Sequence, residues 1–483
     1  MHPAIILRIL GVLLMVYSAT MLPPVAVALL YDDGGQMQFL AAFAITLLSG
    51  MVCWLPVHNV KDDLRVRDGF VVVVLFWTVL GLYGAIPLIL GEAPHMPFTD
   101  AVFESISGLT TTGATVLTNI DDLPHSIKYY RQQLQWLGGM GIIVLAVAIL
   151  PMLGIGGMQL YRAETPGPIK DHKLTPRIAE TAKALWLIYV SLTVVCAICY
   201  FVSGMSAFDA ITHSFSTVAI GGFSTYDASI GHFDSAAIEF ITVFFMLVAG
   251  INFGLHFIAW RHRSVTHYFR DPEFRFYIGV MAAISFFTFL ALMLFSQYES
   301  AYETFRHALF QTVSIATTTG YATADFANWP PVIAVALIMG SFIGACAGST
   351  GGGVKAIRVH LIFKQGLREM RRLIHPNAVM IIKLNKKAVP DRVVEAVWGF
   401  FGVYLMCFCV LFLAVAATGM DFVTAFSAVA ACLNNLGPGL QDVAANYGSI
   451  SDTAKWILCF SMLLGRLEIF TLLVLFTPMF WRH

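Results

Sequence analysis

Apolar residues form long stretches along this chain, and several are long enough to cross a lipid bilayer. Examples are residues 70–90, 185–202 and 398–417. A helix that crosses the hydrocarbon core needs about 20 predominantly apolar residues, so the pattern predicts membrane-spanning helices. The first stretch begins at Ile5. Because no small-residue cleavage site follows it, we expect a retained helix rather than a signal peptide.

Four shorter segments have a different pattern: an amphipathic stretch too short to span a bilayer, then a turn rich in Thr, Gly or Asn, then a polar loop. They are residues 98–115, 207–225, 304–323 and 422–440, and they align on Gly113, Gly222, Gly320 and Gly437. Twelve residues upstream of these glycines stand Ala101, Ala210, Ala308 and Ala425. Six residues upstream stand Ser107, Ser216, Ser314 and Ala431. A register shared by four segments predicts an internal repeat.

Each short segment lies between two spanning segments, so each repeat should run helix, pore loop, helix. Two further spans, at about residues 5–30 and 37–57, precede the repeats. We therefore predict an all-α integral membrane protein with ten transmembrane helices, eight of them in four helix–pore-loop–helix repeats around one pore. The predicted units are an N-terminal two-helix hairpin and four pore repeats, with a basic cytoplasmic linker in the third: 1–68, 69–174, 175–269, 270–390 and 391–483.

Composition agrees with a membrane protein, because 58% of the 483 residues are hydrophobic and only 12% are charged. In soluble domains the charged share is about a quarter. The net charge is zero, yet with alternating spans 24 of the 29 Lys and Arg residues fall on one side. Basic loops stay in the cytoplasm, so we expect both termini inside and an acidic outer face. The outer acids either concentrate cations at the pore mouth or simply solubilise the loops.

The four turns contain residues suited to binding a cation through backbone carbonyls. Non-helical backbone at membrane depth must be buried in protein or line a water-filled cavity. Carbonyl rings replace the hydration shell of potassium in channels that carry TVGYG, and Thr318-Thr319-Gly320-Tyr321 is the closest match here. The alternative is that the glycines only allow close helix packing. The predicted filter residues are Thr111, Thr112, Gly113, Ile220, Gly221, Gly222, Thr318, Thr319, Gly320, Asn435, Leu436 and Gly437.

A glycine-rich stretch at residues 340–353 falls inside the expected second helix of the third repeat. Each glycine costs about 1 kcal/mol relative to alanine within a helix, so we expect the helix to break here. A broken stretch beneath the filter is suited to gating, whereas close packing through small residues is the alternative. The spacing does not fit a Walker A loop, because no Ser or Thr follows Lys355. The candidate gating residues are Gly344, Gly348, Gly351, Gly352, Gly353 and Lys355.

Arg466 is the one Lys or Arg deep inside an expected span. A charge at the bilayer centre costs roughly 2.5–3.5 kcal/mol, so it should face a cavity or a partner. We expect Arg466 to act in gating, either as a barrier below the filter or as a partner of the glycine-rich loop. A buried ion pair with a neighbouring helix is the alternative. A basic cluster follows the loop and is suited to lipid or subunit docking, unless it reflects only the positive-inside rule: Lys355, Arg358, Arg368, Arg371 and Arg372.

Beyond the turns, four long motifs resemble a known family. They are QWLGGMGIIVLAVAILP at 135–151, GGMQLYRAE at 156–164, GACAGSTGGGVKAIR at 344–358 and GRLEIFTLL at 465–473. With these motifs the chain resembles the TrkH-type bacterial potassium uptake subunits of the Trk/Ktr/HKT cation transporter superfamily. The resemblance covers essentially the whole sequence.

The resemblance implies a multi-pass inner-membrane homodimer with one pore per subunit, surrounded by membrane lipid. It also implies a cytoplasmic nucleotide-binding regulatory partner. Potassium is the implied transported ion, with no organic cofactor and no nucleic acid. In the family, a filter glycine in every repeat goes with potassium preference, and Gly113 meets this condition. The fourth turn departs from the pattern because it continues as Gly437-Pro438-Gly439.

Other functions remain as alternatives. A less selective sodium and potassium pore, or an ion-coupled symporter, is compatible with the same repeats. An inverted-repeat transporter for an organic solute would place alternate units in opposite orientations, which the one-sided short segments argue against. A membrane enzyme would need clustered titratable groups, yet the 14 histidines are scattered. We therefore do not expect an enzyme.

Overall fold

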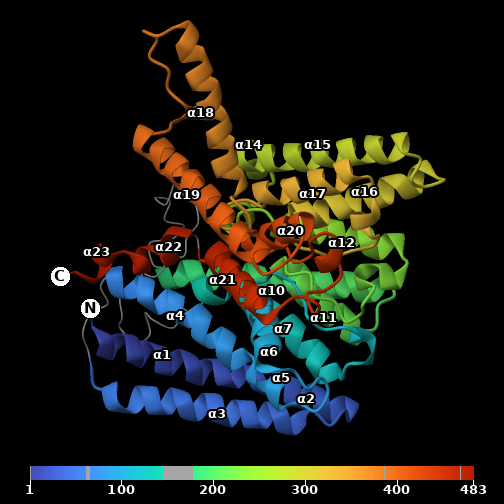
Figure 1. The fold of residues 1–483 in the computed structure, drawn as a ribbon, viewed down its shortest axis with the longest axis vertical. Coiled ribbons are helices and arrows are strands. Elements are labelled where there is room, and N and C mark those ends of the chain that lie inside the picture. Colours follow the sequence, from blue (N-terminus) through green and yellow to red (C-terminus); the bar gives the residue numbers. More distant parts are fainter. Residues whose placement is uncertain (1, 61–65, 145–177, 386, 468, 483) are drawn as a thin grey trace.

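The computed structural model describes residues 2–60, 66–144 and 178–482, apart from residues 386 and 468. The motif at 156–164 therefore lies outside the described residues, as does the end of the motif at 135–151. The described chain is predominantly helical (Figure 1). Six of its helices are long and apolar enough to span a membrane, or up to eight if two bent pairs each count as one span. The prediction of an all-α protein with several apolar spans is confirmed. The ten-helix count and the four repeats stay predictions.

The N-terminal helices form an antiparallel pair along one edge of the molecule (Figure 1). Gly11 and Gly50 bring the two backbones together: a Cβ added to Gly50 would lie 2.8 Å from the Gly11 carbonyl oxygen. Small residues are the usual means of close helix approach in membranes. The pair consists of α1 (Pro3–Ser18), η1 (Ala19–Met21), α2 (Leu22–Tyr31), α3 (Gln36–Trp54) and η2 (Leu55–Val57).

The next helices contain the first two short segments. α12 and α13 meet at an angle of 91° around Gly250, so this apolar pair is sharply bent. The elements are α4 (Val66–Gly84), α5 (Ile86–Leu90), α6 (Phe98–Leu109), η3 (Ile120–Asp122), α7 (His125–Val144), α10 (Ile178–Val202), α11 (Ala207–Ala219), η5 (Ser229–Phe233), α12 (Ala236–Ala249), α13 (Phe253–Arg261) and α14 (Thr266–Arg270).

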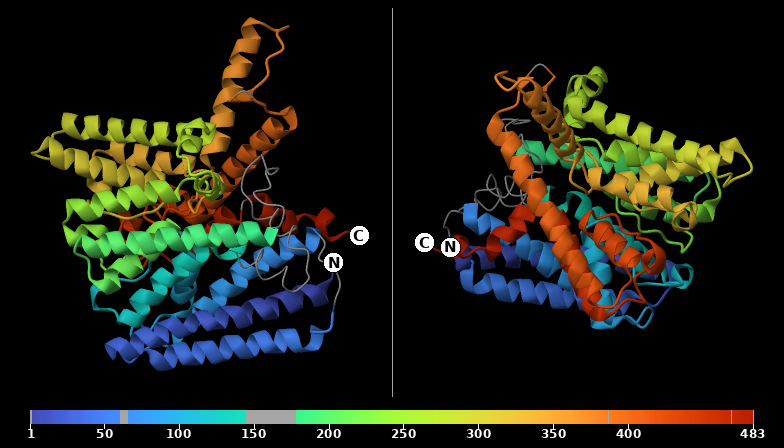
Figure 2. Two further views of the ribbon diagram at one scale, coloured as in Figure 1. Left: turned by 180° about the vertical axis from the view of Figure 1, so that it is seen from behind. Right: turned by 45° about the horizontal axis from the view of Figure 1, so that its top comes forward.

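The remaining helices contain the other two short segments, and α18 projects from the rest of the molecule (Figures 1 and 2). A two-stranded antiparallel hairpin, β1 (Lys383–Leu384) and β2 (Lys387–Ala388), connects α18 to α19. The elements are α15 (Pro272–Leu294), α16 (Ala301–Ala316), η6 (Phe326–Asn328), α17 (Pro331–Ile343), α18 (Ala356–Ile374), α19 (Asp391–Ala416), α20 (Phe422–Leu433), η7 (Gln441–Val443), α21 (Asp452–Arg466), α22 (Ile469–Leu473), η8 (Val474–Phe476) and α23 (Pro478–Trp481).

The short helices α6, α11, α16 and α20 lie in the buried interior, whereas several long helices expose much of their apolar surface. Every residue of α6 from Ala101 to Leu109 is buried. By contrast, only 17% of the apolar window of α3 is buried. The aligned alanines Ala101, Ala210, Ala308 and Ala425 are each no more than 1% exposed. The shared register therefore corresponds to fully buried packing positions.

Candidate functional site

Each of the four short helices ends in the same backbone turn. The residue two before the aligned glycine has a positive φ: 52° at Thr111, 54° at Ile220, 69° at Thr318 and 54° at Asn435. The aligned glycine also has a positive φ: 80° at Gly113, 81° at Gly222, 85° at Gly320 and 100° at Gly437. Four segments that are about a hundred residues apart thus share one conformation.

Equivalent hydrogen bonds close the four turns. The N–H of the residue before each aligned glycine donates to a carbonyl five residues upstream: Thr112 to Ser107 (2.9 Å), Gly221 to Ser216 (2.8 Å), Thr319 to Ser314 (2.8 Å) and Leu436 to Ala431 (2.7 Å). This is the helix cap in which glycine or asparagine usually occupies the left-handed position. Here β-branched Ile220 and two threonines occupy it, and such strain persists mainly where function demands the geometry.

The four turns touch one another in a closed ring. A Cβ added to an aligned glycine would lie less than 3.0 Å from a carbonyl oxygen of the next turn. The contacts run from Gly113 to Gly221, from Gly222 to Thr319, from Gly320 to Leu436 and from Gly437 back to Thr112. Glycine is therefore required twice over, by the positive φ and by the lack of space. The structure brings all twelve predicted filter residues together in this ring.

Polar side chains fix parts of the ring. The Thr110 and Thr112 hydroxyls are 2.7 Å apart, and those of Thr317 and Thr319 are 2.8 Å apart. Asn435 Nδ2 donates to Thr112 Oγ1 at 3.0 Å and joins the fourth turn to the first. Each of these side chains is buried, so water does not compete for the bonds. The bonds therefore help to hold the backbone of the turns in place.

Sequence analysis missed two residues of α7 that support the second turn. Arg131 pairs with Glu104 at 2.8 Å and donates to the Ser224 carbonyl at 3.1 Å. Gln135 donates to the Gly221 carbonyl at 2.7 Å. Arg131 and Gln135 are four residues apart and so lie on one helix face. The available signal was the run of mostly polar residues at 131–135 in a helix that leads toward the apolar stretch after it.

The fourth turn shares the common conformation as far as Gly437. There the Tyr447 hydroxyl donates to the Gly437 carbonyl at 2.7 Å. Pro438 follows and contacts the neighbouring turn, since a Cβ on Gly320 would lie 2.8 Å from Pro438 Cδ. The sequence Gly437-Pro438-Gly439 was expected to make the fourth turn differ from the other three. The difference therefore begins after Gly437, beyond the residues that form the ring.

The glycine-rich stretch breaks the helix between α17 and α18. The helix ends at Ile343, and the next one begins at Ala356. Positive φ angles occur at Gly344 (68°), Gly348 (72°) and Gly353 (76°), and also at Lys355 (82°). The Lys355 ammonium group donates to the Gly351 carbonyl, so the loop is closed on itself.

This loop lies directly against the ends of three short helices. The Gly352 N–H donates to Thr318 Oγ1 at 2.7 Å, and the Gly353 N–H donates to the Asn434 carbonyl at 3.1 Å. Thr350 Oγ1 donates to the Val218 carbonyl at 3.0 Å. Because these partners belong to the second, third and fourth short segments, the loop lies next to the ring of turns.

Arg466 connects the glycine-rich loop to α7. Its Nη1 donates to the Thr350 carbonyl at 3.0 Å. Its Nη2 donates to the carbonyls of Gly138 and Gly139 at 2.8 and 3.2 Å. Of the arrangements considered from sequence, this geometry favours a partner of the loop.

The basic cluster that follows the loop does not form one surface. Lys355 belongs to the loop, and the Arg358 guanidinium lies 4.0 Å from the centre of the Phe400 ring. Arg368 pairs with Asp391 at 2.9 Å, and Arg372 contacts Glu369 at 3.4 Å. The described residues contain no group of three or more His, Cys, Asp or Glu side chains that could hold a metal ion.

Comparison with known proteins identifies the family. Residues 35–483 match the TrkH family, described as cation transport proteins. A Trk system potassium uptake protein TrkH from Halomonas elongata is 59% identical over 477 residues, which cover 99% of both chains. The protein of the same description from Escherichia coli K12 is 58% identical over 483 residues, which cover 100% of both. The crystal structure of the potassium transporter TrkH from Vibrio parahaemolyticus is similar with a TM-score of 0.91 and 55% identity, covering 100% of both chains.

These relatives settle the class that sequence analysis predicted. They are transport proteins rather than enzymes, and the described residues contain the apolar helices that a multi-pass membrane protein requires. The chain belongs to the TrkH family of cation transport proteins.

Proposed function

We propose that this chain takes up potassium ions across the bacterial inner membrane, through the ring of turns at Gly113, Gly222, Gly320 and Gly437. The observation that carries the proposal is the closed contact between the four turns, in which each glycine faces a carbonyl oxygen of the next. Four such turns place backbone carbonyls around one axis, where they replace the water shell of a cation. The fourfold-repeat organisation and the ten spans belong to this proposal.

Two observations support potassium as the ion, and a third supports a cation in general. The relatives from Halomonas and Escherichia are named potassium uptake proteins. Every turn has a glycine at the aligned position, with a positive φ that brings the backbone into the ring. The short helices end at the ring, and the partly negative C-terminal end of a helix favours a cation. No organic cofactor is needed, because an inside-negative potential supplies about 2.3 kcal/mol per charge per 100 mV.

We propose that the glycine-rich loop is the gate. Gly344, Gly348, Gly351, Gly352 and Gly353 give the loop its freedom, and its contacts with three short helices place it against the ring. Arg466 would hold the loop closed through the Thr350 carbonyl. Opening then requires that these bonds break and that the loop moves away from the ring.

The orientation and the assembly are also proposals. Both termini would lie in the cytoplasm, because that orientation keeps most Lys and Arg residues inside. The relatives are named as parts of a Trk system, which supports a further component. We propose that the component is a cytoplasmic nucleotide-binding regulatory subunit and that the chain forms a homodimer.

The test is rubidium uptake into proteoliposomes that contain the full chain, with sodium as the competitor. Gly320→Ser should relax the preference for potassium over sodium, because a side chain at this position would collide with the Leu436 carbonyl. Gly402→Ala is the matched control, since a Cβ there meets nothing within 4 Å. Equal potassium and sodium flux in the unmodified chain would contradict the selectivity, and would favour the less selective pore.

Two further arms test the alternatives. Uptake that requires an imposed proton or sodium gradient, at a fixed membrane potential, would show a symporter instead of a pore. If the chain alone gives no flux, adding the regulatory subunit decides the matter: flux that then appears supports an obligatory partner, and continued absence contradicts the proposal.

A further inference from the structure

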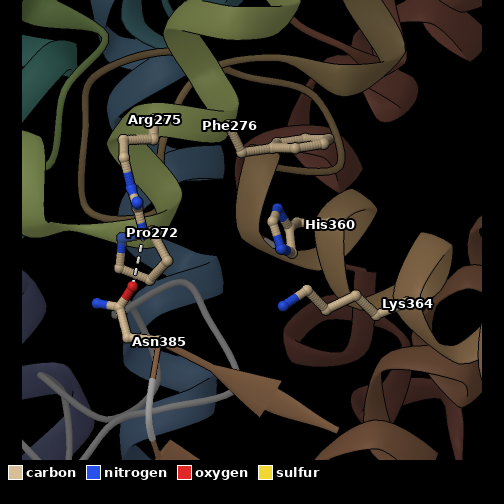
Figure 3. A pocket seen from close by; sticks show the side chains of 6 residues that line it. All are labelled: Pro272, Arg275, Phe276, His360, Lys364 and Asn385. Carbon is tan, nitrogen blue, oxygen red and sulfur yellow. Dashed lines mark hydrogen bonds between the residues drawn. The ribbon is translucent and has the colours of Figure 1, made fainter.

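A cavity of about 410 Å³ lies between the start of α15, the first turns of α18 and the β1–β2 hairpin (Figure 3). Its lining residues are Pro272, Arg275, Phe276, His360, Lys364 and Asn385. Two of these carry a permanent positive charge, and none is acidic. The cavity is separate from the ring of turns, and the ion pathway proposed above does not use it.

The basic side chains converge on the same space from different elements. Figure 3 shows Arg275 on one side of the cavity and His360 and Lys364 on the other. Arg275 Nη2 donates to Asn385 Oδ1 at 2.6 Å, and Asn385 Nδ2 donates to the Arg270 carbonyl at 2.7 Å. The wall of the cavity is therefore built by hydrogen bonds that link the hairpin to the start of α15.

His360 contributes a buried imidazole to the wall of the cavity. Both of its ring nitrogens are buried, and neither has a hydrogen-bond partner among the described residues. The ring packs edge-on against Phe276, with centroids 4.6 Å apart. Burial, together with the nearby Lys364 and Arg275, lowers the pKa of His360 to about 4. A neutral imidazole keeps one N–H to donate, and buried polar groups usually have such a partner.

Other charged groups near the cavity offset only part of its positive charge. Lys364 donates to the Lys383 carbonyl at 2.6 Å, which uses one of the three ammonium hydrogens. Asp271, next to Pro272, interacts electrostatically with Arg275, and its carboxylate caps α15 by accepting from the Phe274 N–H at 2.8 Å. It does not line the cavity. Donors from three side chains thus remain directed at one space.

We propose that this cavity binds a phosphate-bearing anion, held by Arg275, His360 and Lys364. A guanidinium fork, an ammonium and an imidazole N–H suit the several oxygens of a tetrahedral phosphate, and charge-assisted hydrogen bonds of this kind are strong. The phosphate belongs either to the headgroup of an anionic phospholipid or to a soluble phosphate compound. Phe363, next to Lys364 on α18, is 63% exposed, which favours the lipid.

The bound anion would connect two helices that also hold the glycine-rich loop. Glu273, two residues before Arg275, accepts hydrogen bonds from the N–H groups of Ala347 (2.6 Å) and Ile357 (3.2 Å). Ala347 lies in the loop, and Ile357 lies in the first turn of α18. An occupant of the cavity would therefore stabilise the present position of α18 relative to α15 and, through it, the loop.

The test uses the full chain in detergent, with two probes. Binding of phosphatidylglycerol is measured by native mass spectrometry, and binding of radiolabelled orthophosphate is measured by equilibrium dialysis. Phosphatidylcholine is the control lipid. Whichever probe the unmodified chain binds, the double variant Arg275→Gln/Lys364→Gln should bind it roughly tenfold more weakly, because two charge-assisted hydrogen bonds are lost. Arg371→Gln/Arg372→Gln removes the same charge from the exposed end of α18, and it should bind as the unmodified chain does.

His360→Phe separates a local site from a general charge effect. It keeps an aromatic ring beside Phe276 and replaces the imidazole with a phenyl ring that has no hydrogen-bonding nitrogen, so it should weaken binding without changing the net charge at neutral pH. Loss of phosphatidylglycerol binding in the cavity variants would assign a lipid headgroup, and loss of orthophosphate binding would assign a soluble ligand. If neither probe binds, or if the Arg371/Arg372 control loses as much, the proposal is wrong.

Discussion

Arg466 of α21 donates a hydrogen bond of 3.0 Å to the main-chain carbonyl of Thr350, a residue 116 positions earlier in the chain. The same guanidinium group also binds the carbonyls of Gly138 and Gly139 on α7. One side chain therefore joins the loop between α17 and α18 to a helix from another part of the sequence. Its planar fork can reach these separate acceptors at once.

We expect Arg466→Gln to raise potassium flux through the chain, because the loop loses its connection to α7. Arg466→Lys keeps the charge but cannot reproduce the bonds to separate carbonyls. If the bonds hold the loop, both variants should raise flux; if the charge alone is a barrier, only Arg466→Gln should. Flux and its voltage dependence are measured in proteoliposomes. If the flux and its voltage dependence are unchanged in both variants, Arg466 does not take part in gating.

The buried pair of Glu104 and Arg131 should matter strongly for folding. Glu104 is 0% exposed and Arg131 is 1% exposed, so Glu104→Gln leaves a buried guanidinium without its carboxylate. Removing one partner of a buried ion pair costs about 3–5 kcal/mol. We expect a large drop in the thermal unfolding midpoint of the detergent-solubilised protein. The midpoint is measured by tryptophan fluorescence.

Asp391→Asn is the control for the buried pair. Asp391 pairs with Arg368 but has a side chain that is 75% exposed, so solvent screens the interaction. Its midpoint should stay close to that of the unmodified chain. Equal midpoints for Glu104→Gln and Asp391→Asn would show that the Glu104 pair does not stabilise the fold.

The Tyr447 hydroxyl should influence ion preference through the fourth turn. Tyr447→Phe removes its hydrogen bond to the Gly437 carbonyl, a contribution of about 0.5–1.5 kcal/mol. The freed carbonyl is less well fixed in the ring, so sodium should compete better with rubidium for uptake. Tyr302→Phe, at a position 57% exposed, is the control and should leave competition unchanged. Identical sodium competition in the two variants would show that the Tyr447 hydroxyl does not influence ion selectivity.

The contact between Gly11 and Gly50 should not tolerate even a methyl group. A Cβ on Gly50 would lie 2.8 Å from the Gly11 carbonyl oxygen, and overpacking of this kind costs about 1–3 kcal/mol. Gly50→Ala should therefore lower the unfolding midpoint. Gly279→Ala, where a Cβ meets nothing within 4 Å, should not lower it. A Gly50→Ala midpoint equal to that of Gly279→Ala would mean that the two helices separate at little cost.

The sequence alone determined the features that depend on local pattern. Apolar length predicted a protein with several membrane-spanning helices, since the bilayer demands about 20 apolar residues for each helix. The shared register predicted which glycine in each short segment adopts the common positive φ, because the same buried packing recurs at Ala101, Ala210, Ala308 and Ala425. The glycine density at 340–353 predicted the break between α17 and α18, because glycine is a poor helix former.

Only the tertiary structure decided which groups meet. Gly437 touches Thr112, and Arg466 binds Thr350, although these partners are far apart in the chain. The support of the second turn by Arg131 and Gln135 was likewise not predicted. Local periodicity indicates which face of a helix is buried, but not the neighbour against which that face packs. The closed ring exists because four short helices pack together at once, and that packing depends on all the surrounding spans.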